Sequence, residues 1–185
     1  MKTLATRLTW DGHPVKDCAL AKLHIVAGTL RIAIAAPRRH DMPPWDVPNR
    51  LWKLWEYEAV ELFICTANNP PQYTELEFGP YGHWLGLRLD GVRNIVDREV
   101  AVKYSTERVG PVWIGQASVP LDVLPPRSVE GWRVNLTAVS GPSDNRRYLT
   151  AARLHATQPD FHRPDEWIPG ALPLAISGTL PTREA

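Results

Sequence analysis

The sequence predicts an all-β protein, a β-sandwich built from about ten strands. Short runs in which apolar and polar residues alternate recur along the chain, and this period of two is typical of strands with one buried face. No stretch sustains the period of an amphipathic helix. The 18 prolines and 12 glycines among 185 residues favour many short strands joined by stiff turns.

The first third of the chain predicts a strand, a hairpin and a long loop. The elements expected there are a strand at 4–10, a hairpin of 18–26 and 29–36, an irregular segment at 37–49 and a short helical turn at 50–55. The hairpin turns at Gly28, with Leu30, Ile32 and Ile34 facing inward. A loop as long as 37–49 in a compact domain is often functional or mobile.

Residues 52–90 predict a meander of three antiparallel strands, around which the rest of the chain is organised. The side chains expected on its core face are Val60, Leu62 and Ile64, then Thr74, Leu76 and Phe78, then Leu85, Leu87 and Leu89. The Asn/Pro-rich segment 66–72 and the turn 79–82 separate the strands. A slip of one residue would expose the apolar set, so the register is well specified.

The other face of this meander predicts a binding surface. The side chains expected there are Glu61, Phe63, Tyr73, Glu75, Glu77, Trp84 and Arg88, with Trp55 at the entrance to the first strand. Carboxylates accept hydrogen bonds from paired hydroxyls, an arginine donates them, and rings stack on the C–H faces of a sugar. The alternative is a solvated face on which the acids and Arg88 form ordinary cross-strand pairs.

Shorter elements follow the meander. They are a strand at 94–105, a strand at 111–119, a single helical turn at 120–124, strands at 131–139 and 148–153, a loop at 158–170 and a last strand at 172–176, with a frayed tail from residue 177. On the strand 131–139, Trp132, Val134, Leu136 and Ala138 share one face, and Asn135 lies on the other.

Composition excludes several classes of function. With 21 Lys and Arg against 20 Asp and Glu, the chain lacks the basic excess expected of a nucleic-acid or membrane-surface protein. No apolar run reaches membrane-spanning length, and the first residues lack the apolar core of a secretion signal, so a cytoplasmic location is expected. Two cysteines do not imply a disulfide scaffold. The simplest organisation is one domain over 1–185.

An ordered set of segments from Leu23 onward resembles the bacterial DOMON-like proteins, a group related to the carbohydrate-binding family 9 modules. The segments are Leu51-Trp52 with Val60-Glu61-Leu-Phe-Ile64, Tyr73-Thr-Glu-Leu-Glu-Phe-Gly-Pro-Tyr-Gly-His-Trp84, Arg88-Leu-Asp-Gly-Val-Arg93, Trp113, Ala117-Ser-Val-Pro-Leu121, Gly131-Trp-Arg-Val-Asn135-Leu, Tyr148-Leu and Pro159-Asp-Phe-His162. The resemblance implies an immunoglobulin-like sandwich of two antiparallel sheets, with ligands held on a concave sheet face.

In sugar-binding relatives, two tryptophans sandwich a terminal sugar while acid, amide and arginine groups bind its hydroxyls. Trp55 and Glu61 match the spacing of one such pair, and Asn135 resembles the family's asparagine on the late strand. The chain departs from the pattern at two places. Thr74 and Glu75 follow the tyrosine where glucan-binding modules place an arginine, and Tyr148 is the nearest aromatic to the position of the second tryptophan.

Catalysis and metal binding are weaker alternatives. Glu61 and Glu77 on neighbouring strands are candidates for a glycosidase pair, which needs two carboxyls at a defined separation. Met42 with a distant histidine is the candidate for a haem site, which the haem-binding DOMON relatives suggest. The six histidines show no metal-ligand spacing, and no compact Asp/Asn loop is suited to calcium. We therefore expect no metal and no cofactor.

The function predicted is a non-catalytic, carbohydrate-binding-like module for a small saccharide or glycan. The residues expected to bind it are Trp55, Glu61, Tyr73, Glu75, Glu77, Trp84, Arg88, Asn135 and Tyr148. The alternative is a protein-interaction or accessory sandwich that has kept the fold without a sugar ligand. The sequence leaves the identity of the ligand and the oligomeric state open.

Overall fold

The computed structural model describes residues 1–39, 41–44, 46–67 and 69–172. Within them, the chain forms thirteen strands and four short 3₁₀ turns. The strands are β1 (Lys2–Ala5), β2 (Leu8–Thr9), β3 (Leu20–Val26), β4 (Thr29–Pro37), β5 (Ala59–Thr66), β6 (Asn69–Phe78), β7 (Trp84–Asp90), β8 (Ile95–Asp97), β9 (Lys103–Val109), β10 (Val112–Pro120), β11 (Trp132–Ser140), β12 (Arg147–Thr150) and β13 (Ile168–Ala171). The 3₁₀ turns are η1 (Leu54–Glu56), η2 (Leu121–Val123), η3 (Ser143–Asn145) and η4 (Pro164–Glu166).

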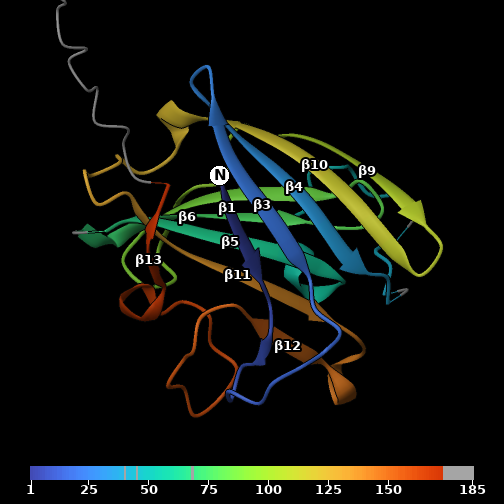
Figure 1. Ribbon diagram of the computed structural model, residues 1–185. Coiled ribbons are helices and arrows are strands. Elements are labelled where there is room, and N and C mark those ends of the chain that lie inside the picture. Colours follow the sequence, from blue (N-terminus) through green and yellow to red (C-terminus); the bar gives the residue numbers. More distant parts are fainter. Residues whose placement is uncertain (40, 45, 68, 173–185) are drawn as a thin grey trace, which may run out of the picture.

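Two antiparallel sheets stack face to face, which confirms the predicted immunoglobulin-like sandwich (Figure 1). The five-stranded sheet has the order β1-β3-β4-β10-β9. The eight-stranded sheet has the order β2-β12-β11-β5-β6-β7-β8, and β13 pairs with β11 outside this path. No helix in the described residues is long and apolar enough to cross a membrane.

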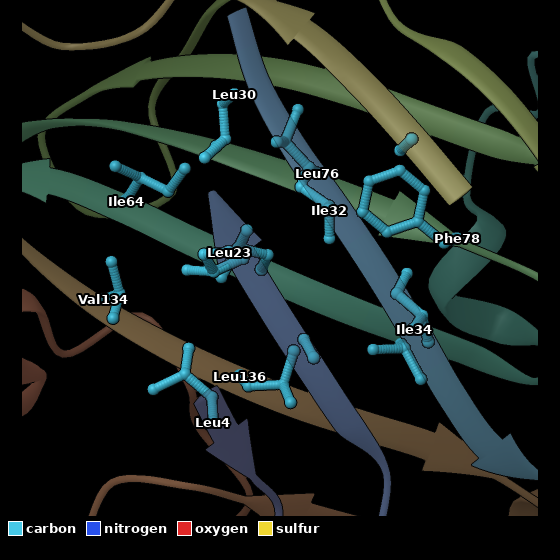
Figure 2. Close-up of a cluster of buried hydrophobic side chains, with 14 of the residues drawn as sticks. Leu4, Leu23, Leu30, Ile32, Ile34, Ile64, Leu76, Phe78, Val134 and Leu136 are labelled. Atoms are coloured by element: carbon cyan, nitrogen blue, oxygen red, sulfur yellow. The ribbon is translucent and has the colours of Figure 1, made fainter. Parts of the chain in front are cut away.

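The main core fills the space between the two sheets. Leu23, Leu30 and Ile32 of the five-stranded sheet meet Leu76 and the aliphatic side chains of β5 and β11 (Figure 2). Burial alternates along β4, so the outer face of this sheet meets solvent. In contrast, seven of the eight residues of β5 are buried. The eight-stranded sheet is therefore covered on both faces.

A second apolar cluster covers the outer face of the eight-stranded sheet. Phe63 and Cys65 of β5 pack there with Tyr73 of β6 and with Leu87 of β7. Trp167, which follows η4, closes over them. This layer is built by loops rather than by a third sheet, and the segments around it leave the space in which the candidate site lies.

The predicted meander is confirmed, but its third strand presents the opposite face. Leu76 lies opposite Gly86 and Phe78 opposite Trp84, so Trp84 points toward the sandwich core. Leu85, Leu87 and Leu89 belong to the second cluster. The prediction that these leucines share the core face was wrong because the loops bury the outer face of this sheet as well, so an apolar set of side chains can lie on either face. The sheet is covered on both faces, so alternation alone could not distinguish them.

Four other predicted elements differ in extent. The strand at 4–10 is divided between β1 and β2, which belong to different sheets, and the strand at 94–105 is likewise divided between β8 and β9. The last strand described is β13, inside the expected loop. Most of the expected strand at 172–176, and the tail after it, lie outside the described residues. The segment 66–72 is shorter than expected, since β6 begins at Asn69.

Candidate functional site

A cavity of about 650 Å³ opens on the outer face of the eight-stranded sheet. Its lining residues come from η1, β5, β6, β7, β8, β11, η3, β12 and the segments that connect the strands: Asp41, Trp55, Glu56, Glu61, Glu75, Leu87, Leu89, Arg93, Ile95, Val139, Gly141, Pro142, Ser143, Arg146, Tyr148, Pro159, Phe161 and His162. From the long segment 37–49, Asp41 contributes to the wall. The strands thus form a floor, and the loops form walls around it.

Three glutamates stand side by side on this floor. Glu61 of β5 lies directly opposite Glu77 of β6, and Glu75 lies two positions away on the same strand and face. Their exposed fractions are 3% for Glu61, 5% for Glu75 and 0% for Glu77. Glu61 and Glu75 reach the cavity, whereas Glu77 lies near the backbone of Trp55 in η1 and does not line it.

The three carboxyls have few partners. The Thr137 hydroxyl, across the ladder on β11, donates to Glu61 at 2.7 Å. Neither carboxyl oxygen of Glu77 accepts a hydrogen bond, although the Trp55 amide is its nearest favourable group. Within the described part of the chain, Glu75 has no hydrogen bond and none of the three carboxyls has an ion pair. Buried acids are ordinarily paired, so this cluster is exceptional.

Burial favours the protonated form of all three acids, and repulsion by neighbouring acids adds to this at Glu75 and Glu77. Burial raises the pKa of Glu61 from 4.5 to about 7, against the opposing effects of the Thr137 hydrogen bond and the Arg146 charge. Burial, then the charge of Glu61, raises the pKa of Glu75 well above 4.5. Burial, then the charges of Glu75 and Glu61, does the same for the pKa of Glu77. The site therefore holds protons near neutral pH.

Arg146 connects three parts of the cavity wall. Its guanidinium donates to the carbonyl oxygens of Trp55 and Tyr57 beside η1, and to that of Gly141 in the loop after β11. It also pairs with Asp41 at 3.3 Å. Its side chain is nearly buried, so these contacts fix the wall in which Trp55 stands.

A second arginine, Arg93, organises the opposite wall. Its backbone N–H donates to the hydroxyl of Tyr73 at 2.9 Å, and its guanidinium pairs with Asp160 at 2.9 Å. The Tyr73 hydroxyl already accepts from Arg93, so its own proton is free for Nδ1 of His162, 2.7 Å away. Burial, with the charge of Arg93, lowers the pKa of His162 to about 4. His162 is therefore neutral, with its proton on Nε2.

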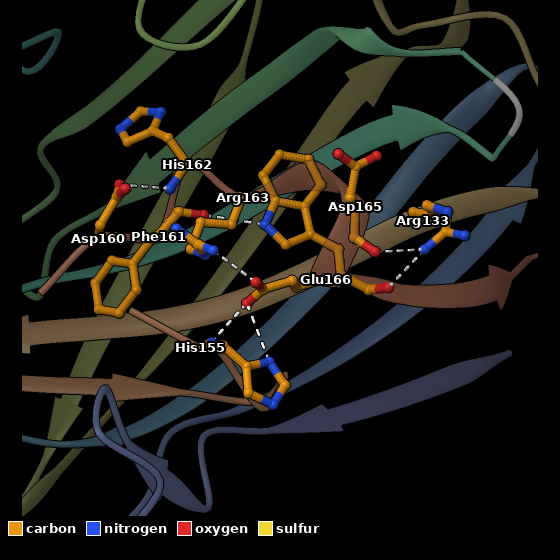
Figure 3. Close-up of polar contacts among 9 residues, drawn as sticks. Arg133, His155, Asp160, Phe161, His162, Arg163, Asp165 and Glu166 are labelled. Atoms are coloured by element: carbon orange, nitrogen blue, oxygen red, sulfur yellow. Dashed lines mark hydrogen bonds and ion pairs between the residues drawn. The ribbon is translucent and has the colours of Figure 1, made fainter. Parts of the chain in front are cut away.

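The segment 155–167 is held firmly beside the cavity (Figure 3). Glu166 accepts from the backbone N–H of His155 and from the Arg163 guanidinium, both at 2.7 Å. Arg133 of β11 donates to the carbonyl of Asp165. These hydrogen bonds, within the segment and to β11, hold Phe161 and His162 in the wall of the cavity.

Aromatic side chains stand around the cavity. Trp55 is half-buried and meets Trp52 edge-on, with ring centroids 5.0 Å apart. Tyr148 of β12 is also half-buried, and its ring lies 6.2 Å from that of Phe161. Half-buried rings with fixed neighbours are suited to stacking against a ligand.

The structure brings together part of the predicted binding set. Trp55, Glu61, Glu75 and Tyr148 line the cavity. Tyr73, Glu77 and Asn135 lie on the same face of the sheet but outside the lining. The oxygen of Asn135 accepts from the Thr150 hydroxyl and the Ala152 amide, so this side chain holds β11 to the strand beside it.

Trp84 and Arg88 lie on the other face of the sheet, which corrects their predicted placement. Trp84 packs against the main core, and Arg88 is exposed and pairs with Asp97 of β8 at 3.3 Å. The physical reason is the register of β7, in which Leu87, and neither of these two residues, lies opposite Glu75.

Five charged or aromatic residues of the site were not predicted from the sequence: Asp41, Arg93, Arg146, Phe161 and His162. All five lie in loops, where no periodicity predicts the direction of a side chain. The available signal in the sequence was the run Asp160-Phe-His162, which is one of the segments that resemble the DOMON-like proteins. No group of His, Cys, Asp and Glu side chains in the described residues is arranged to hold a metal ion.

The fold is a β-sandwich of two antiparallel sheets, and a solved structure shares it. A protein from Bacteroides uniformis, assigned provisionally as carbohydrate-binding, aligns over 90% of this chain and 84% of its own, with a TM-score of 0.68 and 15% identity. A family 9 carbohydrate-binding module from Caldicellulosiruptor kristjanssonii, in complex with glucose, aligns over 82% of this chain and 74% of its own with a TM-score of 0.48 and 12% identity. The first likeness shows the fold, and the second is too distant to add to it.

The chain belongs to the UPF0462 family. It is 34% identical to the mouse UPF0462 protein C4orf33 homolog over 164 residues, which are 84% of this chain and 83% of the mouse protein. It is also 34% identical to the human UPF0462 protein C4orf33 over 163 residues, 83% of this chain and 80% of that protein. No family model matches the chain. The predicted membership of a bacterial DOMON-like group was therefore wrong, since these relatives are vertebrate UPF0462 proteins.

Proposed function

We propose that this protein is a non-catalytic binding module that holds a small saccharide or glycan in the cavity on the eight-stranded sheet. The observation that carries the proposal is the combination of half-buried rings, Trp55 and Tyr148, with the acids Glu61 and Glu75 in one cavity. Rings cover the C–H faces of a sugar, and carboxyls bind its hydroxyls. A volume of about 650 Å³ suits a small ligand.

The surroundings of the acids support binding rather than hydrolysis. A glycosidase needs two carboxyls that flank one bond of the substrate. Glu61 and Glu77, the candidate pair, do not both contact a ligand in the cavity, because Glu61 lines the cavity and Glu77 does not. The provisional assignment of the Bacteroides protein agrees with a binding role.

Calorimetric titration of the full chain with a panel of mono- and oligosaccharides tests the proposal. We expect saturable binding of at least one sugar at millimolar concentration or below. Trp55→Ala and Tyr148→Ala each remove a stacking face, so each should weaken binding by about tenfold or more. The absence of any response across the panel would refute the proposal.

Tyr81→Ala serves as the matched control for Tyr148→Ala. Tyr81 is also a partly buried ring with an arginine beside it, Arg108 at 5.0 Å from the ring centre, but it does not line the cavity. Its removal should leave the affinity unchanged. Equal losses in both variants would mean that the effect reflects folding rather than stacking.

A further inference from the structure

We infer that the preferred ligand of this cavity is an amino sugar, whose ammonium group binds between the carboxyls of Glu61 and Glu75. This inference rests on the proposed function and specifies its ligand class. It starts from an imbalance of charge in the cavity, where each arginine already has an acidic partner and the glutamates on the floor have no basic one.

The charge balance follows from the groups that face the cluster. These are Asp41 from the segment after β4, Glu56 from η1, Glu77 from β6, Arg93 from the turn between β7 and β8, Arg146 before β12, Tyr148 from β12, and Asp160 and His162 from the segment after it. Arg146 pairs with Asp41, Arg93 with Asp160, and Glu56 with Lys53. His162 is neutral. Glu61, Glu75 and Glu77 form no ion pair within the described chain; the charges of Arg146 and Arg93 act on Glu61 and Glu75 only from a distance.

Glu75 points to a ligand independently of this count. This residue is only 5% exposed, and it lines the cavity without a hydrogen bond to any described residue. A buried acid with no partner costs free energy. An ammonium group in the cavity would donate three hydrogen bonds and would offset the repulsion between neighbouring acids. A sugar hydroxyl can donate one hydrogen bond and brings no charge.

Ammonium binding must also expel protons. Without a ligand, burial raises the pKa of Glu61 to about 7, and burial with the charge of Glu61 raises that of Glu75 well above 4.5, so the pair is partly protonated near neutral pH. A cation between them favours the ionised form and releases those protons. At higher pH, Glu61 and Glu75 carry fewer protons before the ligand binds. The affinity for the amine should therefore rise with pH until the amine itself loses its proton.

The experiment compares three forms of each sugar by calorimetry at pH 6.5 with the full chain. The probes are glucosamine, galactosamine and mannosamine, each beside its neutral parent sugar and its N-acetylated form. We expect at least one amine to bind about tenfold or more tightly than both neutral forms. Titration in two buffers with different ionisation enthalpies should show that the amine, but not the parent sugar, releases protons on binding.

Glu75→Gln keeps the shape of the side chain and removes its charge. The ratio of amine affinity to parent affinity should fall toward one in this variant, whereas Glu107→Gln, on exposed β9, should preserve the ratio. If the Glu75 variant does not fold, proton release by the unaltered protein still decides the question.

The outcomes separate the inference from the proposed function. Neutral sugars that bind as tightly as the amines, without proton release, would overturn the inference and leave the proposed function standing. Binding of simple amines such as putrescine, with no response to any sugar, would overturn both. Absence of binding by every probe would also overturn both.

Discussion

Glu61 and Glu77 face each other directly across the β5–β6 ladder, and no ion pair among the described residues reaches either carboxyl. Like charges placed opposite each other in a ladder are destabilising. Glu75, on the same face, adds a third acid. The arrangement therefore lowers the free energy of unfolding. A role in ligand binding is a physical reason for the chain to keep these acids.

Replacing Glu77 with glutamine should stabilise the protein at pH 8. The pKa of Glu77 is raised well above 4.5 in the folded state, so the folded protein retains a proton that the unfolded chain loses. Stability therefore falls as the pH rises above about 4.5. Glu77→Gln removes this loss, and we expect a gain of about 1–3 kcal/mol at pH 8 and little change at pH 4.5.

Urea unfolding at both pH values measures this effect. Glu107→Gln on β9 is the control, since that side chain is exposed and its neutralisation should change stability little at either pH. A Glu77→Gln variant that is less stable than the unaltered protein at pH 8 would show that the ionised carboxyl has a stabilising partner.

His162 should make the protein less stable as the pH falls, whereas Glu77 makes it less stable as the pH rises. Its pKa is lowered from 6.5 to about 4 in the folded state, so the unfolded chain binds a proton first as the pH falls. The stability that neutral His162 provides is thus present above pH 6.5 and is lost between pH 6.5 and 4. His162→Gln, which can still accept from Tyr73, should lose less stability between pH 7.5 and 4.5 than the unaltered protein.

The control for His162 is His24→Gln, which changes an exposed histidine on β3. The opposing contributions of Glu61 and His162 overlap between pH 4.5 and 6.5, so the comparison uses differences between variants rather than the slope of one protein. Unfolding curves at pH 7.5 and 4.5 that are shifted equally in both variants would contradict the expectation.

Gly86 on β7 should not tolerate a side chain. A Cβ at this position would lie 2.9 Å from Cβ of Val100 and 3.1 Å from its carbonyl oxygen. Gly86→Ala should therefore lower the free energy of unfolding by about 1–3 kcal/mol. Val100→Gly removes both the Cβ contact at 2.9 Å and the Cγ1 contact at 3.2 Å, so the alanine should cost less in that background. Thermal unfolding of the single and double variants measures the coupling, and strict additivity would argue against the contact.

Sequence reasoning placed strands well where one face is polar and the other apolar. On β5 and β6 the acids separated the two faces, so Glu61, Glu75 and Glu77 were placed together correctly. On β7 the leucines, such as Leu87, lie on the outer face and Trp84 on the core face; because both faces of this sheet are covered, the pattern did not show which face the leucines take. The face that β7 turns toward the core is set by contacts with other segments, such as that of Gly86 with Val100. The local sequence of the strand does not show these contacts.

The side chains that form the cavity walls could not be predicted from the sequence, for a related reason. Arg146 and His162 take their positions from contacts with segments about ninety residues away, such as Tyr57 for Arg146 and Tyr73 for His162. Loop side chains have no repeating pattern that fixes their direction. The alternation of strands could predict the floor of the site, therefore, but not the groups that turn it into a cavity.

Arg146 and Arg88 should differ sharply in their effects on ligand binding, although the sequence predicts a hydroxyl-binding role for Arg88 alone. Arg146 holds Trp55 and Asp41 in the wall, so Arg146→Ala should weaken saccharide binding by about tenfold or more and lower stability by about 2–4 kcal/mol. Arg88 is exposed on the other face, and Arg88→Ala should change the affinity less than about twofold. Calorimetric titration with the best sugar of the panel measures both. A large loss in the Arg88 variant, with binding intact in the Arg146 variant, would place the ligand on the opposite side of the sheet, because the two guanidinium groups lie on different faces and only one can contact or organise a given site.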